Sequence, residues 1–383
     1  MCDLFIFAGE ASGDTHGQSL VQEILKLRPD LKISGVAGPK MRKEGVKPIL
    51  KMEDFQVMGF QDVFLALPGL ISKFFQVRDW ILQNKPKAVV LIDYPGFNLR
   101  LAKALKKGGF KGKVLHYICP SVWAWGKGRI KTLAKYVDEL YTIYPFEKKY
   151  FENTPLSVHY IGNPVVETLK KTPLNPEWKK LSGLPETFQG PLIALFPGSR
   201  KQEIEKNLNL QLEAAEKIKE AIPHAEFALS VTSPKIQAVI SEYLSKSKLK
   251  IPIVPSCFNY ELMKESQAAI AKSGTITLEL ALSKCPTTVI YGVSPLNRFI
   301  AKYLIRLKLP YFCIVNILKN EEVFPELIEK GFNADALTLK SLALLEDEAV
   351  KTKTLTGCQE VIDILGDSHA SEIAAKHVVA KCS

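Results

Sequence analysis

A glycine-rich turn at residues 8–14, Ala-Gly-Glu-Ala-Ser-Gly-Asp, constrains the fold of this chain more than any other segment. It follows the apolar run 4–7, which predicts a buried strand. After it, apolar residues recur at the spacing of a helix: Leu20, Val21, Ile24 and Leu27. A strand, a glycine turn and a helix in this order open a doubly wound sheet, in which ligands bind beyond the carboxyl ends of the strands.

Within this turn, Gly9 and Gly13 let the backbone bend tightly and let a ligand approach it. Ser12 or Asp14 can cap the helix that follows. Glu10 is a carboxylate in a turn that faces the expected ligand cleft, and packing explains it poorly. We interpret Glu10 as a candidate catalytic group, with a solvated loop acid as an equal alternative.

The alternation of strand and helix continues through both halves of the 383 residues. Near-continuous apolar runs predict parallel strands buried on both faces, at 32–37, 88–93, 113–119, 140–144, 158–161, 192–196, 225–231, 251–254, 268–272, 286–291 and 311–315. The segment 171–190 has the composition of a linker. We therefore expect an α/β fold of two doubly wound, Rossmann-like domains facing a cleft. The domains are expected at 1–175 and 190–350, with a helical segment at 351–383 packing back toward the first domain.

The charge balance points to an anionic partner. With 51 Lys and Arg against 40 Asp and Glu, the formal net charge is +11, which favours phosphate, nucleic acid or an acidic lipid surface. The excess is concentrated in residues 100–149. Seven scattered cysteines without metal-ligand spacing indicate a reduced, cytoplasmic protein with no zinc site. No signal peptide is expected, and no apolar run approaches the ~20 residues that span a bilayer, so any membrane association is expected to be peripheral.

Two segments carry a membrane or partner signal. The first, 63–82, is more apolar than a surface helix requires, and Pro68 is placed as a helix start. A core-facing helix and a patch for membrane or acyl chains are equal alternatives here, and the residues of that patch are Phe64, Leu67, Leu70, Ile71, Phe74 and Phe75. The second, 296–309, has the pattern of a basic amphipathic helix, which fits a solvated face or an anionic lipid contact equally well.

Two loops in the second half have the features of a diphosphate site. Pro197-Gly198-Ser199-Arg200 follows a strand, with Glu203 just after it, and Arg200 supplies a guanidinium fork suited to phosphate. Ser273-Gly274-Thr275 follows another strand and opens a helix, whose N-terminus attracts anions. Glu279, one turn further, can accept hydrogen bonds from ribose hydroxyls. The chain has no P-loop motif, and no Asp-x-Asp that would indicate metal-dependent handling of a diphosphate.

A second acid follows the strand predicted at 88–93. In Asp93-Tyr94-Pro95-Gly96-Phe97-Asn98, Asp93 would reach the same sheet edge as Glu10. Two acids at a cleft suit general-base activation of a hydroxyl, and a structural acid that caps the next helix is the equal alternative.

Together these motifs resemble the lipid A disaccharide synthases, inverting glycosyltransferases of the two-Rossmann type. The resemblance covers nearly the whole chain and rests on these segments: 9–14, Val36-Ala37-Gly38-Pro39, Val57-Met58-Gly59, Asp93 with Asn98, Ser121-Val122-Trp123-Ala124-Trp125, Tyr144-Pro145-Phe146-Glu147, 197–200, 273–275 with Glu279, and Asn316.

The resemblance implies condensation of UDP-2,3-diacylglucosamine with 2,3-diacylglucosamine 1-phosphate into a β-1,6-linked disaccharide, with UDP as the leaving group. It implies Asp93 as the general base, with Glu10 as the second acid, and a loop of Gly9, Ser12, Gly13 and Asn98 at the acceptor. It assigns UDP to Gly198, Ser199, Arg200, Glu203, Ser273, Gly274, Thr275, Glu279 and Asn316. For the apolar patch at 63–82, it favours contact with a membrane or with acyl chains over a core-facing helix.

The resemblance further implies no cofactor, no metal, no nucleic acid, and peripheral attachment to the anionic inner face of the inner membrane. It also allows a homodimer. Two alternatives remain: another UDP-sugar enzyme of this fold, such as a UDP-N-acetylglucosamine 2-epimerase or the muramyl-type transferase, and a non-catalytic nucleotide-binding module in which Glu10 and Asp93 are dispensable.

Overall fold

The computed structural model describes residues 2–55, 60–124, 126, 128–292, 310–328 and 331–382, and gives the backbone alone for 60–67. Its contacts divide the chain into two units. Unit 1 comprises residues 1–167 and 367–383, and unit 2 comprises residues 168–366. The division after Glu167 lies upstream of the segment 171–190, which the sequence suggested as a linker and which contains the short helix α7 (Trp178–Leu181).

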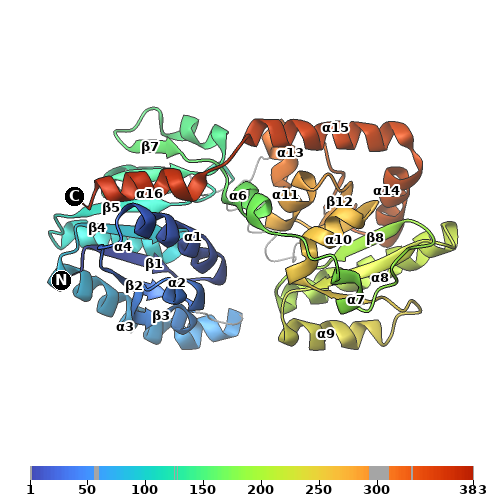
Figure 1. Cartoon of the computed structure of the whole chain (residues 1–383), viewed down its shortest axis with the longest axis horizontal. Coiled ribbons are helices and arrows are strands. Elements are labelled where there is room, and N and C mark those ends of the chain that lie inside the picture. The colour runs from blue at the N-terminus through green and yellow to red at the C-terminus, as the bar shows by residue number, and fades with distance from the viewer. Residues whose placement is uncertain are drawn as a thin grey trace. The chain divides into compact units, whose positions relative to one another are not determined.

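Unit 1 is built on a parallel sheet of seven strands in the order β3-β2-β1-β4-β5-β6-β7 (Figure 1). Its central strands are buried along their whole length, as expected of strands covered by helices on both faces. The strands are β1 (Leu4–Ala8), β2 (Ile33–Ala37), β3 (Lys47–Lys51), β4 (Ala88–Ile92), β5 (Lys113–Tyr117), β6 (Glu139–Thr142) and β7 (Ser157–Tyr160).

Two apolar cores lie on the two faces of this sheet. One contains residues of α1 (Ala11–Leu27), α2 (Pro39–Lys43) and α16 (Ala370–Ala380). The other contains residues of α3 (Phe60–Asn84), α4 (Pro95–Lys107) and α5 (Gly128–Tyr136). The 3-10 helices Met52–Phe55 and Pro145–Phe151 complete the unit, and α6 (Pro164–Lys171) leads into unit 2.

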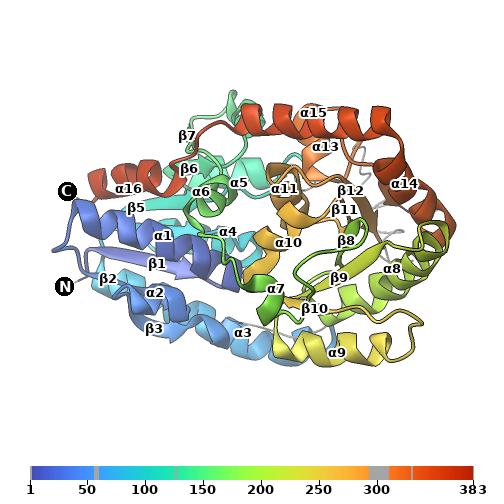
Figure 2. The same ribbon diagram turned by 45° about the vertical axis from the view of Figure 1, so that its right-hand side comes forward.

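Helix α16 returns to the first unit from the far end of the chain and packs beside α1 (Figures 1 and 2). Its buried residues include Ala374, Ala375 and Val378, and small side chains let two helices approach closely. At its start, the backbone N–H of Ser371 donates to Glu167 at 2.9 Å, and the Ser371 hydroxyl donates to the same carboxylate. The sequence predicted that 351–383 packs as one segment, whereas α15 (Glu348–Leu365) belongs to unit 2.

Unit 2 repeats the architecture with six parallel strands in the order β10-β9-β8-β11-β12-β13. The strands are β8 (Leu192–Phe196), β9 (Glu226–Val231), β10 (Ile253–Pro255), β11 (Ala268–Lys272), β12 (Thr287–Tyr291) and β13 (Glu326–Ile328). Its other helices are α8 (Lys201–Ala221), α9 (Pro234–Leu244), a 3-10 turn (Ser256–Phe258), α10 (Asn259–Glu265), α11 (Thr275–Leu282), α13 (Ile314–Lys319) and α14 (Ala334–Glu346). Helices α8 and α14 lie side by side over one face (Figure 2).

The structure corrects the predicted elements in three places. Strand β3 was not predicted, because its exposed lysines hide the apolar signal of an edge strand. The strand predicted at 311–315 is wrong: a helix begins at Ile314, and the edge strand of unit 2 is β13. Pro68 does not start a helix but lies within α3. The other predicted strands agree to within a few residues at each end.

In the part of the chain that the structure describes, no helix combines the length and the apolarity needed to cross a bilayer.

Candidate active site

In each unit, the predicted motifs lie where the strand order reverses. In unit 1 the reversal lies between β1 and β4, whose last paired residues are Ala8 and Ile92. In unit 2 it lies between β8 and β11, where Phe196 pairs with Ala271. Ligands of doubly wound sheets bind outside the carboxyl ends of the strands at this point. The two acids of unit 1 and the two loops of unit 2 therefore occupy the expected binding edges.

The chain after β4 makes an unusual turn at Asp93. Asp93 and Tyr94 have φ values of 42° and 46°, a left-handed conformation that is uncommon outside glycine. The buried Asn98 side chain holds this turn, donating to the carbonyls of Ile92 at 3.1 Å and Asp93 at 2.6 Å. A side chain at Gly9 would collide with the Tyr94 ring at 2.7 Å. Asn98 and Gly9, predicted at the acceptor loop, thus shape the turn that presents Asp93.

The environment of Asp93 suits a general base. Burial, followed by the negative charge of Glu10, raises the pKa of Asp93 to about 6, against the opposing effects of the Tyr94 amide and Arg129. A carboxylate with a raised pKa is a stronger base yet is still ionised at neutral pH. The negative charge of Glu10 therefore acts on Asp93, although the two acids were predicted from separate motifs. Arg129, on α5, is a charged group near Asp93 that the sequence analysis did not single out as functional.

Helix α1, which follows the glycine turn after β1, does not have the N-cap that the sequence predicted. The N-cap of α1 is Glu10 rather than Ser12 or Asp14, and its side chain makes no capping bond. Ser12 is exposed in the first turn. Asp14 is buried, and its carboxylate accepts hydrogen bonds from the backbone N–H groups of Lys40 at 2.9 Å and Met41 at 3.1 Å. Asp14 therefore stabilises the start of α2.

Gly13 and Gly38 fit this packing. A Cβ on Gly38 would lie 2.3 Å from the Asp14 carboxyl carbon, so the motif that contains Gly38 leaves room for the Asp14 carboxylate. Gly13 is buried, and a Cβ there would meet Ala8 at 3.4 Å. That distance is an ordinary van der Waals contact, so the packing of α1 on β1 leaves room for a Cβ at position 13.

Two further motifs of unit 1 meet at Glu147. This buried carboxylate accepts hydrogen bonds from the amides of Ile143 and Tyr144 at 3.0 and 3.1 Å and from the Trp123 indole at 3.3 Å. Trp123 also packs edge-on against Phe146. Burial raises the pKa of Glu147 to about 7 in spite of these donors. Nothing in the local sequence of either segment indicates that this acid joins them. Trp125 lies outside the described residues.

In unit 2, an ion pair joins the two predicted loops. Lys272, the last residue of β11, lies 3.0 Å from Glu203 Oε1. The other oxygen of Glu203 accepts the backbone N–H of Ser199 at 2.9 Å and that of Arg200 at 3.4 Å. Burial pushes the pKa of Glu203 upward, but Lys272 and the Ser199 amide outweigh it and hold the pKa below its ordinary value. Glu203 therefore holds the backbone of the loop 197–200 and ties it to the end of β11.

Gly198 completes this loop. Its φ is +127°, and a Cβ would lie 2.7 Å from the side chain of Glu203, so both backbone and space require glycine. Arg200 is exposed at the N-cap of α8, and Ser199 is likewise exposed. The loop therefore presents a guanidinium and a hydroxyl to solvent above a fixed backbone, which suits phosphate recognition.

The second loop begins α11 at Gly274. The N-cap of this helix is Gly274, and neither Ser273 nor Thr275 caps it; the Thr277 hydroxyl donates to the Gly274 carbonyl at 2.7 Å. Gly274 and Thr275 are exposed, and Ser273 is buried. The exposed first turn keeps the helix N-terminus accessible to an anion.

Glu279 lies one turn deeper on α11, and burial raises its pKa to about 7. Its charge also contributes, after burial, to raising the pKa of Tyr260 on α10. A partly buried acid with a pKa near neutral can either accept or donate a hydrogen bond, and a ribose hydroxyl can pair with either form.

Asn316 has a different environment from that predicted. It is fully buried on α13, where its amide donates to the Phe324 carbonyl and Glu326, and its oxygen accepts from the amides of Val323 and Phe324. These bonds join α13 to the segment that leads into β13. The side chain has no exposed atom for UDP, so the structure gives Asn316 a structural role instead of the predicted contact.

The apolar patch on α3 divides into buried and exposed positions. Leu70 and Phe74 pack against the core of unit 1, and Phe74 contacts Phe97 edge-on. Ile71 and Phe75 are 48% and 45% exposed, four residues apart on one side of the helix. The side chains of Phe64 and Leu67 lie outside the described residues, as do Val57-Met58-Gly59 and the basic segment 296–309.

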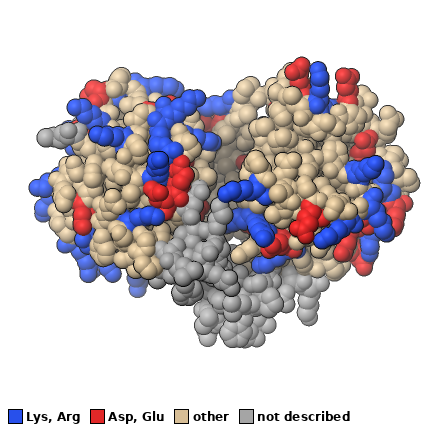
Figure 3. Space-filling view, turned by 90° about the horizontal axis from the view of Figure 1, so that it is seen from below, with Lys and Arg blue, Asp and Glu red and all other residues tan. Residues whose placement is uncertain are grey.

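Basic side chains are not confined to one segment. In the view of Figure 3, Lys and Arg occur over both units, with Asp and Glu among them. Helix α5, with the sequence Gly-Arg-Ile-Lys-Thr-Leu-Ala-Lys-Tyr, lies within the segment 100–149, in which the sequence concentrates its basic excess.

Comparisons with known proteins agree on one family. A family model described as lipid-A-disaccharide synthetase matches residues 4–378. Among curated proteins named lipid-A-disaccharide synthase, that of Chlamydia felis is 39% identical over 363 residues, covering 94% of this chain and 57% of the relative. The Chlamydia muridarum protein is 40% identical, covering 96% and 60%. The Geobacter sulfurreducens protein is 38% identical, covering 97% of this chain and 95% of the relative. The chain thus spans about three fifths of the chlamydial relatives, at 57–60% of their length.

Solved structures share the fold at low identity. A Staphylococcus aureus MnaA–UDP co-structure superposes with a TM-score of 0.65 at 15% identity, covering 99% of this chain and 96% of that one. The UDP-GlcNAc 2-epimerase of Neisseria meningitidis, bound to UDP-GlcNAc, gives 0.64 at 13%, covering 98% of each chain. These likenesses establish the two-Rossmann fold of the GT-B type.

Proposed function

Because this chain belongs to the lipid-A-disaccharide synthetase family, we propose that it is a glycosyltransferase that forms the lipid A disaccharide. The donor is UDP-2,3-diacylglucosamine, the acceptor is 2,3-diacylglucosamine 1-phosphate, and the products are the β-1,6-linked tetraacyl disaccharide 1-phosphate and UDP. The observation that carries the proposal is the placement of two acids and two anion-binding loops at the points where the strand order of each sheet reverses.

In this proposal, unit 2 holds the donor. The loop at Gly198, Ser199 and Arg200 and the exposed start of α11 bind the diphosphate, through a guanidinium and through free backbone N–H groups. Glu279 accepts hydrogen bonds from the ribose. Glu203 acts indirectly, because its carboxylate already bonds the loop amides and Lys272.

Unit 1 supplies the base and the acceptor loop. Asp93 removes the proton of the acceptor 6-hydroxyl, and that oxygen attacks C1 of the donor sugar while the bond from C1 to the UDP oxygen breaks. A single displacement of this kind converts an α-linked donor into a β-linked product. The raised pKa of Asp93 supports this assignment. For Glu10 we propose a role in positioning the acceptor.

We propose that the diphosphate leaves without the help of a metal ion, its charge being stabilised by Arg200 and the N-terminus of α11. We also propose peripheral attachment to an anionic membrane face, where acylated substrates reside. The exposed pair Ile71 and Phe75 supports this attachment, because apolar side chains that protrude beside lysines and arginines favour an anionic lipid surface.

A coupled assay for UDP tests the proposal. The purified chain is mixed with UDP-2,3-diacylglucosamine, with and without the acylated acceptor, in buffer containing a chelator. We expect UDP to form only when both substrates are present, and not from UDP-N-acetylglucosamine. Isomerisation of the unacylated sugar would instead move the assignment to the epimerase class, and UDP binding without turnover would favour a binding module.

A further inference from the structure

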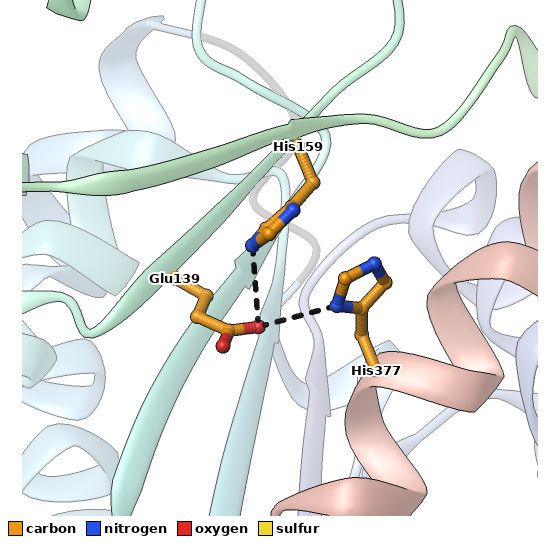
Figure 4. Close-up of side chains that lie close together, drawn as sticks. All are labelled: Glu139, His159 and His377. Carbon is orange, nitrogen blue, oxygen red and sulfur yellow. Dashed lines mark ion pairs between the residues drawn. The ribbon is translucent and has the colours of Figure 1, made fainter.

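A cluster of three side chains that can bind a metal lies away from the proposed active site, near the edge of the unit 1 sheet that β6 and β7 form. Glu139 lies on β6, His159 on β7 and His377 on α16, and one donor atom from each lies within 4.8 Å of the other two (Figure 4). Among the described residues, this is the one group of three or more His, Cys, Asp or Glu side chains whose donor atoms lie this close together. The mechanism proposed above uses none of the three.

The geometry is close to that of a tetrahedral zinc site. Glu139 Oε2 is 3.9 Å from His159 Nε2 and 3.8 Å from His377 Nδ1. Zinc–nitrogen and zinc–oxygen bonds of about 2.0–2.2 Å place the ligand atoms of one ion about 3.4 Å apart. The two carboxylate-to-ring distances therefore need to shorten by about 0.4–0.5 Å, while the two ring nitrogens lie within 4.8 Å of each other and must also approach. Figure 4 shows both rings directed toward the same carboxylate.

The surroundings of the cluster also suit a metal ion. Glu139 is buried, and the Tyr141 hydroxyl donates to its Oε2 at 2.9 Å, the kind of outer bond that orients a ligating carboxylate. The two imidazole side chains are 31% and 32% exposed, which gives an ion a path of entry and leaves the fourth position to water. The Ser157 hydroxyl, 2.9 Å from His159 Nε2, must rotate away on binding.

The positive charge of Lys381 opposes the binding of a cation at this cluster. Lys381 Nζ pairs with the other Glu139 oxygen at 2.7 Å. Its positive charge weakens the attraction for a cation, while Oε2 stays available to the two rings. Removal of this charge is therefore expected to strengthen binding.

We propose that Glu139, His159 and His377 bind one Zn²⁺ ion, which fastens α16 to the sheet of unit 1. The role proposed for the ion is to hold α16 in place, and the ion takes no part in the glycosyl transfer proposed above. Since α16 lies far from the neighbouring strands β6 and β7 along the chain, one ion would join the C-terminal helix to both strands.

The test is a titration of the full chain, freed of metal by a chelator, with ZnCl₂ followed by calorimetry and with CoCl₂ followed by absorption. We expect one ion per chain, a cobalt spectrum without the thiolate band that the exposed Cys257 would produce, and affinity reduced at least about tenfold in His159→Ala and in His377→Ala. His369→Ala, at the exposed start of the same helix, is the matched control and should bind as the wild type does.

Two further measurements guard against misfolded variants. Lys381→Met should bind zinc more tightly than the wild type, and zinc should raise the unfolding temperature of the wild type but not of His377→Ala. Absence of stoichiometric zinc binding, equal affinity in both histidine variants, or no tightening in Lys381→Met would each overturn the proposal. Because the readouts are binding and unfolding, they are independent of the proposed glycosyl transfer.

Discussion

Lys272 Nζ and Glu203 Oε1 lie 3.0 Å apart and connect the two loops at the strand-order reversal of unit 2. Neither side chain is more than about a fifth exposed, at 21% and 19%, so solvent screens the pair only in part. The pair fixes the loop that carries Ser199 and Arg200 to the strand that leads into α11. The proposed donor site therefore depends on a residue that does not belong to either glycine motif.

Lys272→Met should weaken UDP binding by about ten- to a hundredfold, in line with the loss of a charge-assisted bond worth about 1.5–3 kcal/mol. Glu203→Gln should act in the same direction, and the two changes together should cost less than the sum of both, because they remove one interaction. Calorimetric titration with UDP measures the effect. Lys201→Met is the matched control, since its pair with Glu205 is exposed. Additive losses would contradict the coupling.

Asp93→Asn should lower turnover by at least about a hundredfold, because general-base catalysis typically contributes that much. UDP affinity should stay unchanged, since the proposed donor residues are in unit 2. Rates and UDP binding are compared with those of Asp30→Asn, whose carboxylate forms a surface pair with Arg28. If Asp93→Asn retains its rate while Glu10→Gln loses it, the two acids exchange roles.

The pH dependence of stability gives a separate test of Asp93. The pKa of Asp93 is raised from 3.8 to about 6 in the folded chain. Its ionised form therefore opposes folding, with a cost that grows between about pH 4 and 6 and is fully present above that range. Asp93→Asn should raise the urea midpoint of unfolding at pH 8 and give little gain at pH 4. An equal change at both values would show that burial of the charge is not the cause.

Ile71→Ser combined with Phe75→Ser should reduce binding to vesicles that contain anionic lipid, because the change removes the apolar pair that is exposed on α3. Co-sedimentation with vesicles measures the bound fraction. Leu339→Ser, on the exposed face of α14, removes a comparable apolar side chain that is 68% exposed and should leave binding unchanged. Equal binding by the double variant and the wild type would place the membrane contact elsewhere.

The fold was predictable because buried parallel strands leave continuous apolar runs, such as 88–92, and because glycine turns mark their ends. The edge strands were not predictable in the same way. Strand β3 begins and ends with an exposed lysine, and the apolar residues near 313 belong to the start of a helix. Loop positions followed from local sequence. The partners of those loops did not, because ion pairs such as that of Lys272 join residues 69 positions apart.

Local sequence also misassigned single side chains. Asp14 lies in a turn motif that suggests a ligand or a cap, yet it bonds the start of α2, 26 residues further on. Asn316 was expected to contact UDP, yet its four hydrogen bonds are internal to unit 2. In both cases a polar residue is required by the fold, and only the three-dimensional contacts distinguish that requirement from a role in binding.

The most direct measurement is mass spectrometry of the products formed from UDP-2,3-diacylglucosamine and 2,3-diacylglucosamine 1-phosphate, without added metal. UDP-N-acetylglucosamine serves as the control donor. The account predicts a tetraacyl disaccharide phosphate together with UDP, from the acylated donor alone. Recovery of both substrates unchanged, or conversion of the unacylated sugar instead, would contradict it.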